Sequence, residues 1–177
     1  MRQHRRALSR ARQAHATQQV CLRIMRTHYW RAANRIAFYW PADGEVSLLP
    51  LLRESLRRGK QCYLPVVEHK HLRFREFRRG HALRRNRYGI PEPSRTAICA
   101  THQLDVIFLP LVAFDAQCNR LGMGAGFYDR ALAAHTTSKP WRIGIAHEFQ
   151  KVARLPVDPW DVPLNIIITN SQIYRPT

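Results

Sequence analysis

Three glycines alternate with other residues in the segment 120–126, which reads Arg-Leu-Gly-Met-Gly-Ala-Gly. Glycine lets the backbone approach a ligand closely and turn several amide N–H groups toward one point. The residues that follow, Phe127 to Ala134, can form a helix, and a helix N-terminus favours an anion. Arg120 adds a cation that can bind phosphate through two hydrogen bonds. The segment therefore predicts a phosphate-binding loop, although a plain glycine-rich turn is an equally good interpretation of these residues alone.

The common nucleotide-binding motifs do not describe this loop. It contains no Gly-Lys-Ser or Gly-Lys-Thr, so it is not a P-loop. The apolar run before it, Val106 to Phe114, predicts a buried strand that ends several residues before the first glycine. A dinucleotide-binding fingerprint has its glycines in the tight turn directly after the strand. We therefore do not interpret Glu148, which follows the glycines at the spacing of a ribose-binding acid, as such a residue.

A longer string around the loop is more specific. Residues 109–115 read LPLVAFD and residues 120–130 read RLGMGAGFYDR. This string closely resembles the signature of the 5-formyltetrahydrofolate cyclo-ligase family, the methenyltetrahydrofolate synthetases, in a bacterial form. The resemblance covers nearly the whole chain and is strongest over 104–130. It implies that the ATP phosphates are bound by Arg120, Leu121, Gly122, Met123, Gly124, Ala125, Gly126, Phe127, Tyr128 and Asp129.

The resemblance also implies a folate site. Glu45 precedes an amphipathic helix that Gly59 ends, and a carboxylate at a helix start is stabilised by the helix dipole without any ligand. The cyclo-ligases have an acid at this place that hydrogen-bonds the pterin ring. A stiff, proline-containing segment lines their folate site, where an aromatic ring stacks on the substrate. The matching residues here are Tyr88, Ile90 and Pro91, and Tyr128 is expected to contact folate as well as ATP.

Charged residues near both ends match the family less completely. In the cyclo-ligases a lysine and an arginine at the start of the first helix reach the ATP phosphates. Residues 4–9 resemble the end of that element, so its first part would lie before Met1. Arg2, Arg5 and Arg6 are then the candidates for this role, or else they form a solvated basic face. Asp161 matches the acid that helps to hold the magnesium of MgATP, although alone it would be interpreted as a turn residue.

Strand and helix signals alternate along the chain. Strands are predicted at 35–40, 61–67, 72–77, 106–114, 141–146 and 165–169. Helices are predicted after Ser9, which can cap the first one, before Gly59, and from Phe127 to near His135. This alternation predicts a single domain over residues 1–177, an α/β fold in which helices sandwich a largely parallel, Rossmann-like sheet in three layers.

The charge is unevenly distributed. The chain carries a net charge of +17, and residues 1–96 hold 22 Lys and Arg against 6 Asp and Glu. Such a surface suits a nucleic-acid-binding protein, but the sequence has none of the known nucleic-acid motifs. It equally suits an enzyme that binds ATP and a folate with a tail of one or several glutamates. A third class, another α/β enzyme acting on a phosphorylated small molecule, would share the glycine-rich loop but would not need Glu45 and Tyr88.

The remaining composition predicts a cytoplasmic monomer. No apolar run approaches the ~18 residues of a membrane span, and no secretory segment opens the chain. The four cysteines have neither Cys-x-x-Cys nor zinc spacing, which is typical of thiols in a reducing cytosol. Cys118 lies in the signature loop where the family usually has glycine, so we expect an exposed, oxidisable thiol.

The activity that the resemblance implies is the ATP- and Mg²⁺-dependent conversion of 5-formyltetrahydrofolate to 5,10-methenyltetrahydrofolate, with release of ADP and phosphate. ATP would phosphorylate the formyl oxygen, nitrogen-10 would attack the same carbon, and phosphate would leave. The protein then needs mainly to position two substrates and to neutralise phosphate charge. This agrees with a sequence that has no evident Ser/His/Asp triad and in which none of the nine histidines is assigned a catalytic role.

Overall fold

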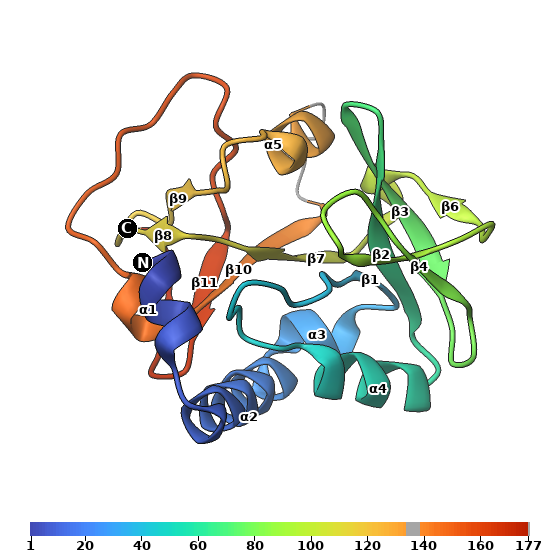
Figure 1. Cartoon of the computed structure of the whole chain (residues 1–177), viewed down its shortest axis with the longest axis horizontal. Helices are drawn as coiled ribbons and strands as arrows, with labels where there is room; N and C mark the ends of the chain where they lie inside the picture. The colour runs from blue at the N-terminus through green and yellow to red at the C-terminus, as the bar shows by residue number, and fades with distance from the viewer. Residues whose placement is uncertain (134–138, 177) are drawn as a thin grey trace.

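A central sheet of eight strands organises the chain in the computed structural model, which describes residues 1–133 and 139–176 (Figure 1). The strand order is β12-β11-β10-β7-β1-β2-β3-β6. The pairs from β11 to β2 are parallel, whereas β12, β3 and β6 join antiparallel at the two edges. The bounds are β1 Arg35–Ala37, β2 Gln61–Glu68, β3 His71–Phe77, β6 Ile98–Cys99, β7 Val106–Pro110, β10 Trp141–Ala146, β11 Ile166–Thr169 and β12 Ile173–Tyr174. The predicted largely parallel α/β sheet is confirmed.

Helices lie on both faces of this sheet. Figure 1 shows α1 to α4 on one side and α5 on the other. The side chains of β7 alternate accordingly: Val106 and Phe108 pack in the core beneath α2 and α4, while Ile107 and Leu109 pack in the core on the side of α5. The helices are α1 Arg2–Ala7, α2 Arg10–Arg26, α3 His28–Ala32, α4 Leu49–Arg57 and α5 Phe127–Leu132, with 3₁₀ turns η1 Thr101–Gln103 and η2 Glu148–Gln150. The predicted helix end near His135 lies outside the described residues.

The helix signals in the sequence act as expected. Ser9 caps α2, because its hydroxyl accepts a hydrogen bond from the backbone N–H of Arg12 at 3.3 Å. The apolar face of α2 is buried against the sheet, so this basic helix belongs to the fold. Gly59 follows α4 with φ +75°, the left-handed conformation that glycine adopts without strain.

Two short hairpins outside the main sheet were not predicted. One pairs β4 Leu83–Arg85 with β5 Pro91–Pro93, and the other pairs β8 Ala113–Phe114 with β9 Arg120–Leu121. The second hairpin divides the apolar run 106–114, which we expected to be one strand, into β7 and β8. The edge strands β6 and β12 were also missed, because two-residue strands carry no periodic signal. None of the described helices is long and apolar enough to cross a membrane.

Candidate active site

The candidate site is built around the point where the order of the strands in the sheet reverses. From β1 the chain proceeds to β2 on one side, and it then returns to β7, β10 and β11 on the other side of β1. Ligands bind at such a switch point, beyond the carboxyl ends of the parallel strands. Hydrogen bonds tie the segments after these ends together: Gln150 Nε2 donates to the carbonyl of Leu111 at 2.7 Å, and His147 Nε2 lies 3.0 Å from the carbonyl oxygen of Gly44. The segments that follow β1, β7 and β10 therefore form one surface.

The glycine-rich loop connects β9 to α5 on this surface (Figure 1). Gly124 and Gly126 have φ of +87° and +61°, which disfavours other L-residues. A Cβ on Gly126 would also lie 2.8 Å from the NH1 atom of Arg130. Leu121 and Met123 are exposed. The loop thus has the special backbone and the open position that a phosphate-binding loop requires.

Arg120 is held inside the site rather than in solvent. Its side chain is 6% exposed, and its NH2 atom is paired with the carboxylate of Asp129 at the start of α5. Asp129 Oδ1 also accepts a hydrogen bond from the backbone N–H of Val162 at 3.3 Å. Nε of Arg120 is buried, and no described residue accepts a hydrogen bond from it. Arg120 is consequently a fixed, incompletely satisfied cation beside the glycine-rich loop.

Asp161 lies near Arg120 although 41 positions separate them, since both line a small depression together with Asn119, Pro156 and neighbouring residues. Asp161 Oδ2 accepts a hydrogen bond from the backbone N–H of Asp158 at 2.9 Å, so the residue also stabilises a turn. No group of three or more metal-ligating side chains exists among the described residues. A metal ion at Asp161 would therefore need most of its ligands from a bound molecule and from water.

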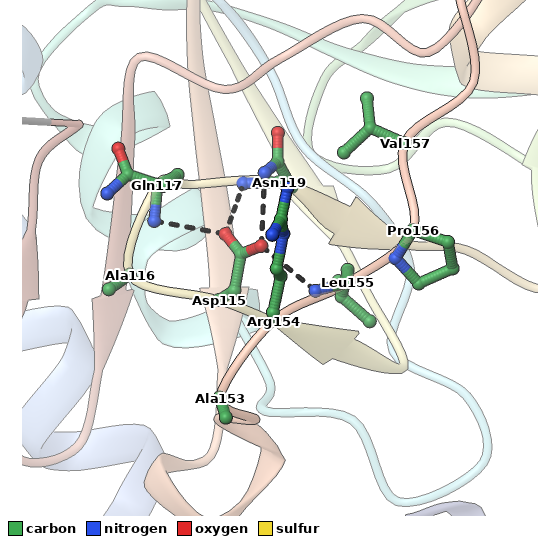
Figure 2. A pocket seen from close by; sticks show the side chains of 9 residues that line it. All are labelled: Asp115, Ala116, Gln117, Asn119, Ala153, Arg154, Leu155, Pro156 and Val157. Atoms are coloured by element: carbon green, nitrogen blue, oxygen red, sulfur yellow. Dashed lines mark hydrogen bonds between the residues drawn. The ribbon is translucent and has the colours of Figure 1, made fainter.

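A larger hollow of about 780 Å³ adjoins this depression (Figure 2). Asp115 in its wall is buried, and its carboxylate accepts hydrogen bonds from the backbone N–H groups of Gln117, Asn119 and Leu155. Burial alone would raise the pKa of Asp115, but these bonds and one from the Asn119 amide lower it. Asp115 thus fixes the wall. The lining residues are Asp115, Ala116, Gln117, Asn119, Ala153, Arg154, Leu155, Pro156 and Val157, and the sequence did not predict this hollow.

The three N-terminal arginines converge on Asp43, which sequence analysis missed. Nε of Arg2 donates to its carboxylate at 2.7 Å, NH2 of Arg5 donates at 3.0 Å, and Nε of Arg6 forms the third ion pair. Burial of Asp43 opposes its ionisation, but the hydrogen bonds from Arg2, Arg6 and Arg5 prevail and lower its pKa to about 2. Arg2 and Arg6 are 50% and 61% exposed, whereas Arg5 is 1% exposed. They do not form a uniform solvated face.

Glu45 lies beside this cluster, with most of its side chain covered. It precedes α4, as expected, but by four residues, so its carboxylate is not in the first turn of that helix. Its Oε2 instead accepts a hydrogen bond from the backbone N–H of Ala42 at 3.0 Å, and its Oε1 lies 4.0 Å from NH1 of Arg5. The side chain is 10% exposed, and burial raises the pKa of Glu45 to about 7. A carboxyl group whose pKa is raised by burial beside charged groups is typical of a functional site.

Two tyrosines share the environment of Glu45. Burial raises the pKa of Tyr39 and of Tyr128, and the negative charge of Glu45 raises both further. The positive charge of Arg120 acts on Tyr128 in the opposite direction. Tyr128 is therefore close enough to feel both Glu45 of the predicted folate site and Arg120 of the predicted phosphate site. Tyr39, whose hydroxyl donates to the carbonyl of Val46, was not predicted.

Tyr88 lies next to the glycine-rich loop. Its ring is 54% exposed and meets the ring of Phe127 edge to face, with centroids 6.4 Å apart. Asn86 fixes the tight turn that carries it, because its Oδ1 accepts hydrogen bonds from the backbone N–H groups of Tyr88 and Ile90 at 2.8 and 3.0 Å. Pro91 begins β5 and is partly buried, like Ile90. A predicted folate residue thus contacts a predicted phosphate-loop residue.

The expectation of an exposed Cys118 was wrong. Its side chain is fully buried in the core on the α5 side, and burial raises the pKa of its thiol to about 11. The physical reason is the β8–β9 hairpin, which folds residue 118 back onto the sheet with φ +62°. Cys21, Cys62 and Cys99 are buried as well, and all four thiols are free.

Comparison with known proteins agrees with this architecture. The sequence model of the 5-formyltetrahydrofolate cyclo-ligase family matches residues 1–170. The cyclo-ligase of Escherichia coli K12 is 38% identical over 180 residues, covering 99% of each chain, and that of Haemophilus influenzae is 37% identical over 169 residues, covering 93% of this chain and 90% of the relative.

Two solved structures are similar over almost the whole chain. The Aquifex aeolicus 5,10-methenyltetrahydrofolate synthetase has a TM-score of 0.87 and 32% identity, with 98% of this chain and 88% of that chain covered. The Mycoplasma pneumoniae synthetase has a TM-score of 0.77 and 30% identity, with 96% and 93% covered. The chain belongs to the 5-formyltetrahydrofolate cyclo-ligase family.

Proposed function

We propose that the chain catalyses the ATP-dependent cyclisation of 5-formyltetrahydrofolate to 5,10-methenyltetrahydrofolate, with release of ADP and phosphate. The observation that carries this proposal is the contact between Tyr88 and Phe127, which joins the predicted folate-binding residues to the predicted phosphate-binding loop. Family membership supports the same reaction. The formyl oxygen is a poor leaving group, and a phosphoryl group supplied by ATP converts it into a good one. The protein's task is then to place two substrates side by side and to stabilise phosphate charge.

The ATP phosphates are assigned to residues 120–129 and to the N-terminal arginines. The amide groups of the glycine-rich loop and the guanidinium of Arg120 provide donors at one place, and Asp129 fixes the orientation of Arg120. Arg2 and Arg6 suit phosphate better than Arg5, because Arg5 is buried with both terminal nitrogens within reach of protein groups. Asp161 would hold Mg²⁺ as part of MgATP, since one carboxylate with phosphate oxygens and water is enough for this ion.

The adenosine part of ATP is assigned to the 780 Å³ hollow of Figure 2. A ligand pocket typically measures 300–1,000 Å³, so the size is suitable. Asn119, Pro156 and Val157 line both this hollow and the depression that holds Arg120 and Asp161. A nucleotide can therefore lie in the hollow and extend its phosphates toward Arg120. Replacing Ala116 by Trp should fill the hollow and weaken ATP binding while leaving folate binding unchanged.

The pterin is assigned to Glu45, with Tyr88, Ile90, Pro91 and Tyr128 along the folate. An exposed ring such as Tyr88 can stack on a flat conjugated ligand, and a buried carboxylate can accept hydrogen bonds from pterin N–H groups. The guanidinium of Arg87 lies over the Tyr88 ring, 4.9 Å from its centroid, and suits a carboxylate of a glutamate or polyglutamate tail. Arg73 of β3 and Arg84 of β4 are exposed and could bind further carboxylates of such a tail. We further propose a monomer in the cytoplasm, in accord with four free, buried thiols.

One assay tests the activity. Purified protein with 5-formyltetrahydrofolate and MgATP should produce the near-ultraviolet absorbance of the methenyl product. The absorbance should not develop when ATP or magnesium is omitted. A protein that binds both ligands but forms no product would contradict the proposed reaction.

A further inference from the structure

Asp43 binds only part of the hydrogen-bond donors of the two exposed N-terminal arginines, Arg2 and Arg6. It accepts hydrogen bonds from Nε of Arg2 and Nε of Arg6, the inner nitrogen of each guanidinium. Among the described residues, none accepts a hydrogen bond from the terminal nitrogens of these two arginines. A guanidinium presents its terminal N–H groups as a fork that fits phosphate oxygens. Both arginines are thus anchored on one side and open on the other.

The turn that carries Asp43 is rigid. Asp43 and Gly44 both have positive φ, +52° and +73°, and this turn packs directly against α1. A Cβ on Gly44 would lie 2.6 Å from the carbonyl oxygen of Arg5, so only glycine allows this approach. The buried Arg5 connects this turn to the segment after β7, since its NH2 donates to Asp43 and its NH1 donates to the carbonyl of Leu111 at 2.9 Å. The Asp43 carboxylate therefore has little freedom to move.

Charge within this cluster also favours an anion. Asp43 and the neighbouring Glu45 carry at most two negative charges against three guanidinium groups, and Arg5 lies within reach of both carboxylates. Arg2 and Arg6 consequently keep most of their positive field toward solvent. A second contact holds α1 in its orientation: the ring of His4 stacks on the ring of Phe149 in η2, with centroids 4.1 Å apart. Both ends of this short helix are tied to the switch-point surface.

We propose that Asp43 is a positioning residue for ATP, which holds Arg2 and Arg6 by their Nε atoms so that their terminal nitrogens face the phosphates. The inference rests on the proposed function, in which these two arginines bind phosphate. It assigns to Asp43 no contact with either substrate. Arg5 acts as the buried support of the turn and not as a phosphate ligand.

The test is a double-mutant cycle between Asp43→Asn and the pair Arg2→Ala with Arg6→Ala. Asparagine tolerates positive φ and removes only the charge, so the turn is preserved. An ion pair with a solvent-exposed arginine changes an equilibrium constant by at most about fivefold, and Asp43→Asn removes two such pairs. The variant should therefore raise the Kd for ATP by about three- to twenty-five-fold. The Kd for folate should remain unchanged. Made in the Arg2/Arg6 double variant, Asp43→Asn should have no further effect on ATP binding.

Glu54→Gln is the matched control, because Glu54 is likewise a carboxylate that pairs with two arginines, Arg57 and Arg58, through their Nε atoms. It should leave both dissociation constants unchanged. The inference is overturned if Asp43→Asn tightens ATP binding, weakens both ligands equally, or acts independently of the arginines. If the Arg2/Arg6 variant itself binds ATP normally, the phosphate assignment in the proposed function is wrong instead.

Arg6→Lys gives a second test that leaves the contact between Arg5 and Asp43 intact. Lysine keeps the positive charge but has a single nitrogen, so it cannot present a two-nitrogen fork to a phosphate while a separate nitrogen holds Asp43. Because Arg6 is 61% exposed, the exchange should not affect folding. We expect the Kd for ATP to rise at least about threefold. Wild-type affinity in this variant would mean that charge alone suffices, and the positioning role would be refuted.

Discussion

Replacing Glu45 by Gln should make the protein more stable and its folate binding weaker. The side chain is 10% exposed, and burial raises its pKa from an ordinary value near 4.5 to about 7. Gln keeps the shape and an oxygen that can accept the hydrogen bond from Ala42, but it has no charge to bury. The variant therefore separates the function of the carboxylate from its cost to the fold.

The expected stability change follows from proton linkage. Between pH 4.5 and 7 the unfolded chain releases the Glu45 proton before the folded chain does, so the wild type loses stability as the pH rises through this window. A shift of this size corresponds to about 3 kcal/mol at 1.36 kcal/mol per pKa unit. The variant lacks this loss. Its free energy of unfolding should match that of the wild type near pH 4 and exceed it by up to about 3 kcal/mol at pH 8.

The folate effect should have the opposite sign. If ionised Glu45 accepts hydrogen bonds from the pterin, the variant should lose about 1.5–3 kcal/mol of binding, or roughly ten- to a hundredfold in Kd at pH 8. ATP affinity should stay nearly unchanged. Urea unfolding at a series of pH values and separate titrations with a folate analogue and a nucleotide measure both quantities. A stability difference that does not vary with pH would refute the raised pKa, and unchanged folate affinity would refute the pterin role.

Three further predictions concern single side chains. Arg120→Ala should weaken ATP binding, and it should also lower the free energy of unfolding by about 3 kcal/mol, because removing the 6% exposed guanidinium takes away the ion-pair partner of Asp129. Unchanged stability in urea would contradict this buried ion pair. Unchanged turnover at low ATP would contradict the phosphate contact. Tyr88→Ala should cost about 0.5–1.5 kcal/mol or slightly more in folate affinity, with Tyr88→Phe as the control that retains stacking, and little stability, because the ring is 54% exposed. At pH 8 a thiol reagent should label all four cysteines in urea but none in the native protein, since the thiols are buried and burial raises the pKa of Cys118 to about 11. Rapid labelling of Cys118 in the native protein would contradict its burial by the β8–β9 hairpin.

Some site residues were predictable because their signal is local. The glycines at 124 and 126 occupy positive φ, a property of the residue and its backbone alone, so their spacing in the sequence already marks the loop. The strands β2 and β10 and the helix α2 follow hydrophobic periodicity and caps that are likewise local. The same holds for the parallel order of the sheet, since strands that alternate with helices leave few other arrangements.

The environment of the charged groups depended on contacts between distant parts of the chain. Arg5 donates to Leu111, 106 positions away, and this long-range contact distinguishes the buried Arg5 from the exposed Arg2 and Arg6. The sequence shows three nearly equivalent arginines. Their exposures differ because Arg5 points inward to the chain after β7, where water is excluded.

Burial likewise decided the environments of Glu45 and Cys118. Glu45 follows a turn in the sequence as a helix-starting acid would, but α4 begins later and the carboxylate lies against Arg5 in the interior. Cys118 lies in a polar stretch, yet the β8–β9 hairpin folds it into the core. The sequence by itself determined the candidate residues for phosphate and folate binding and the backbone segments that carry them. Only the tertiary structure decided which of these groups are desolvated, because the cost of removing a charge from water depends on every atom packed around it.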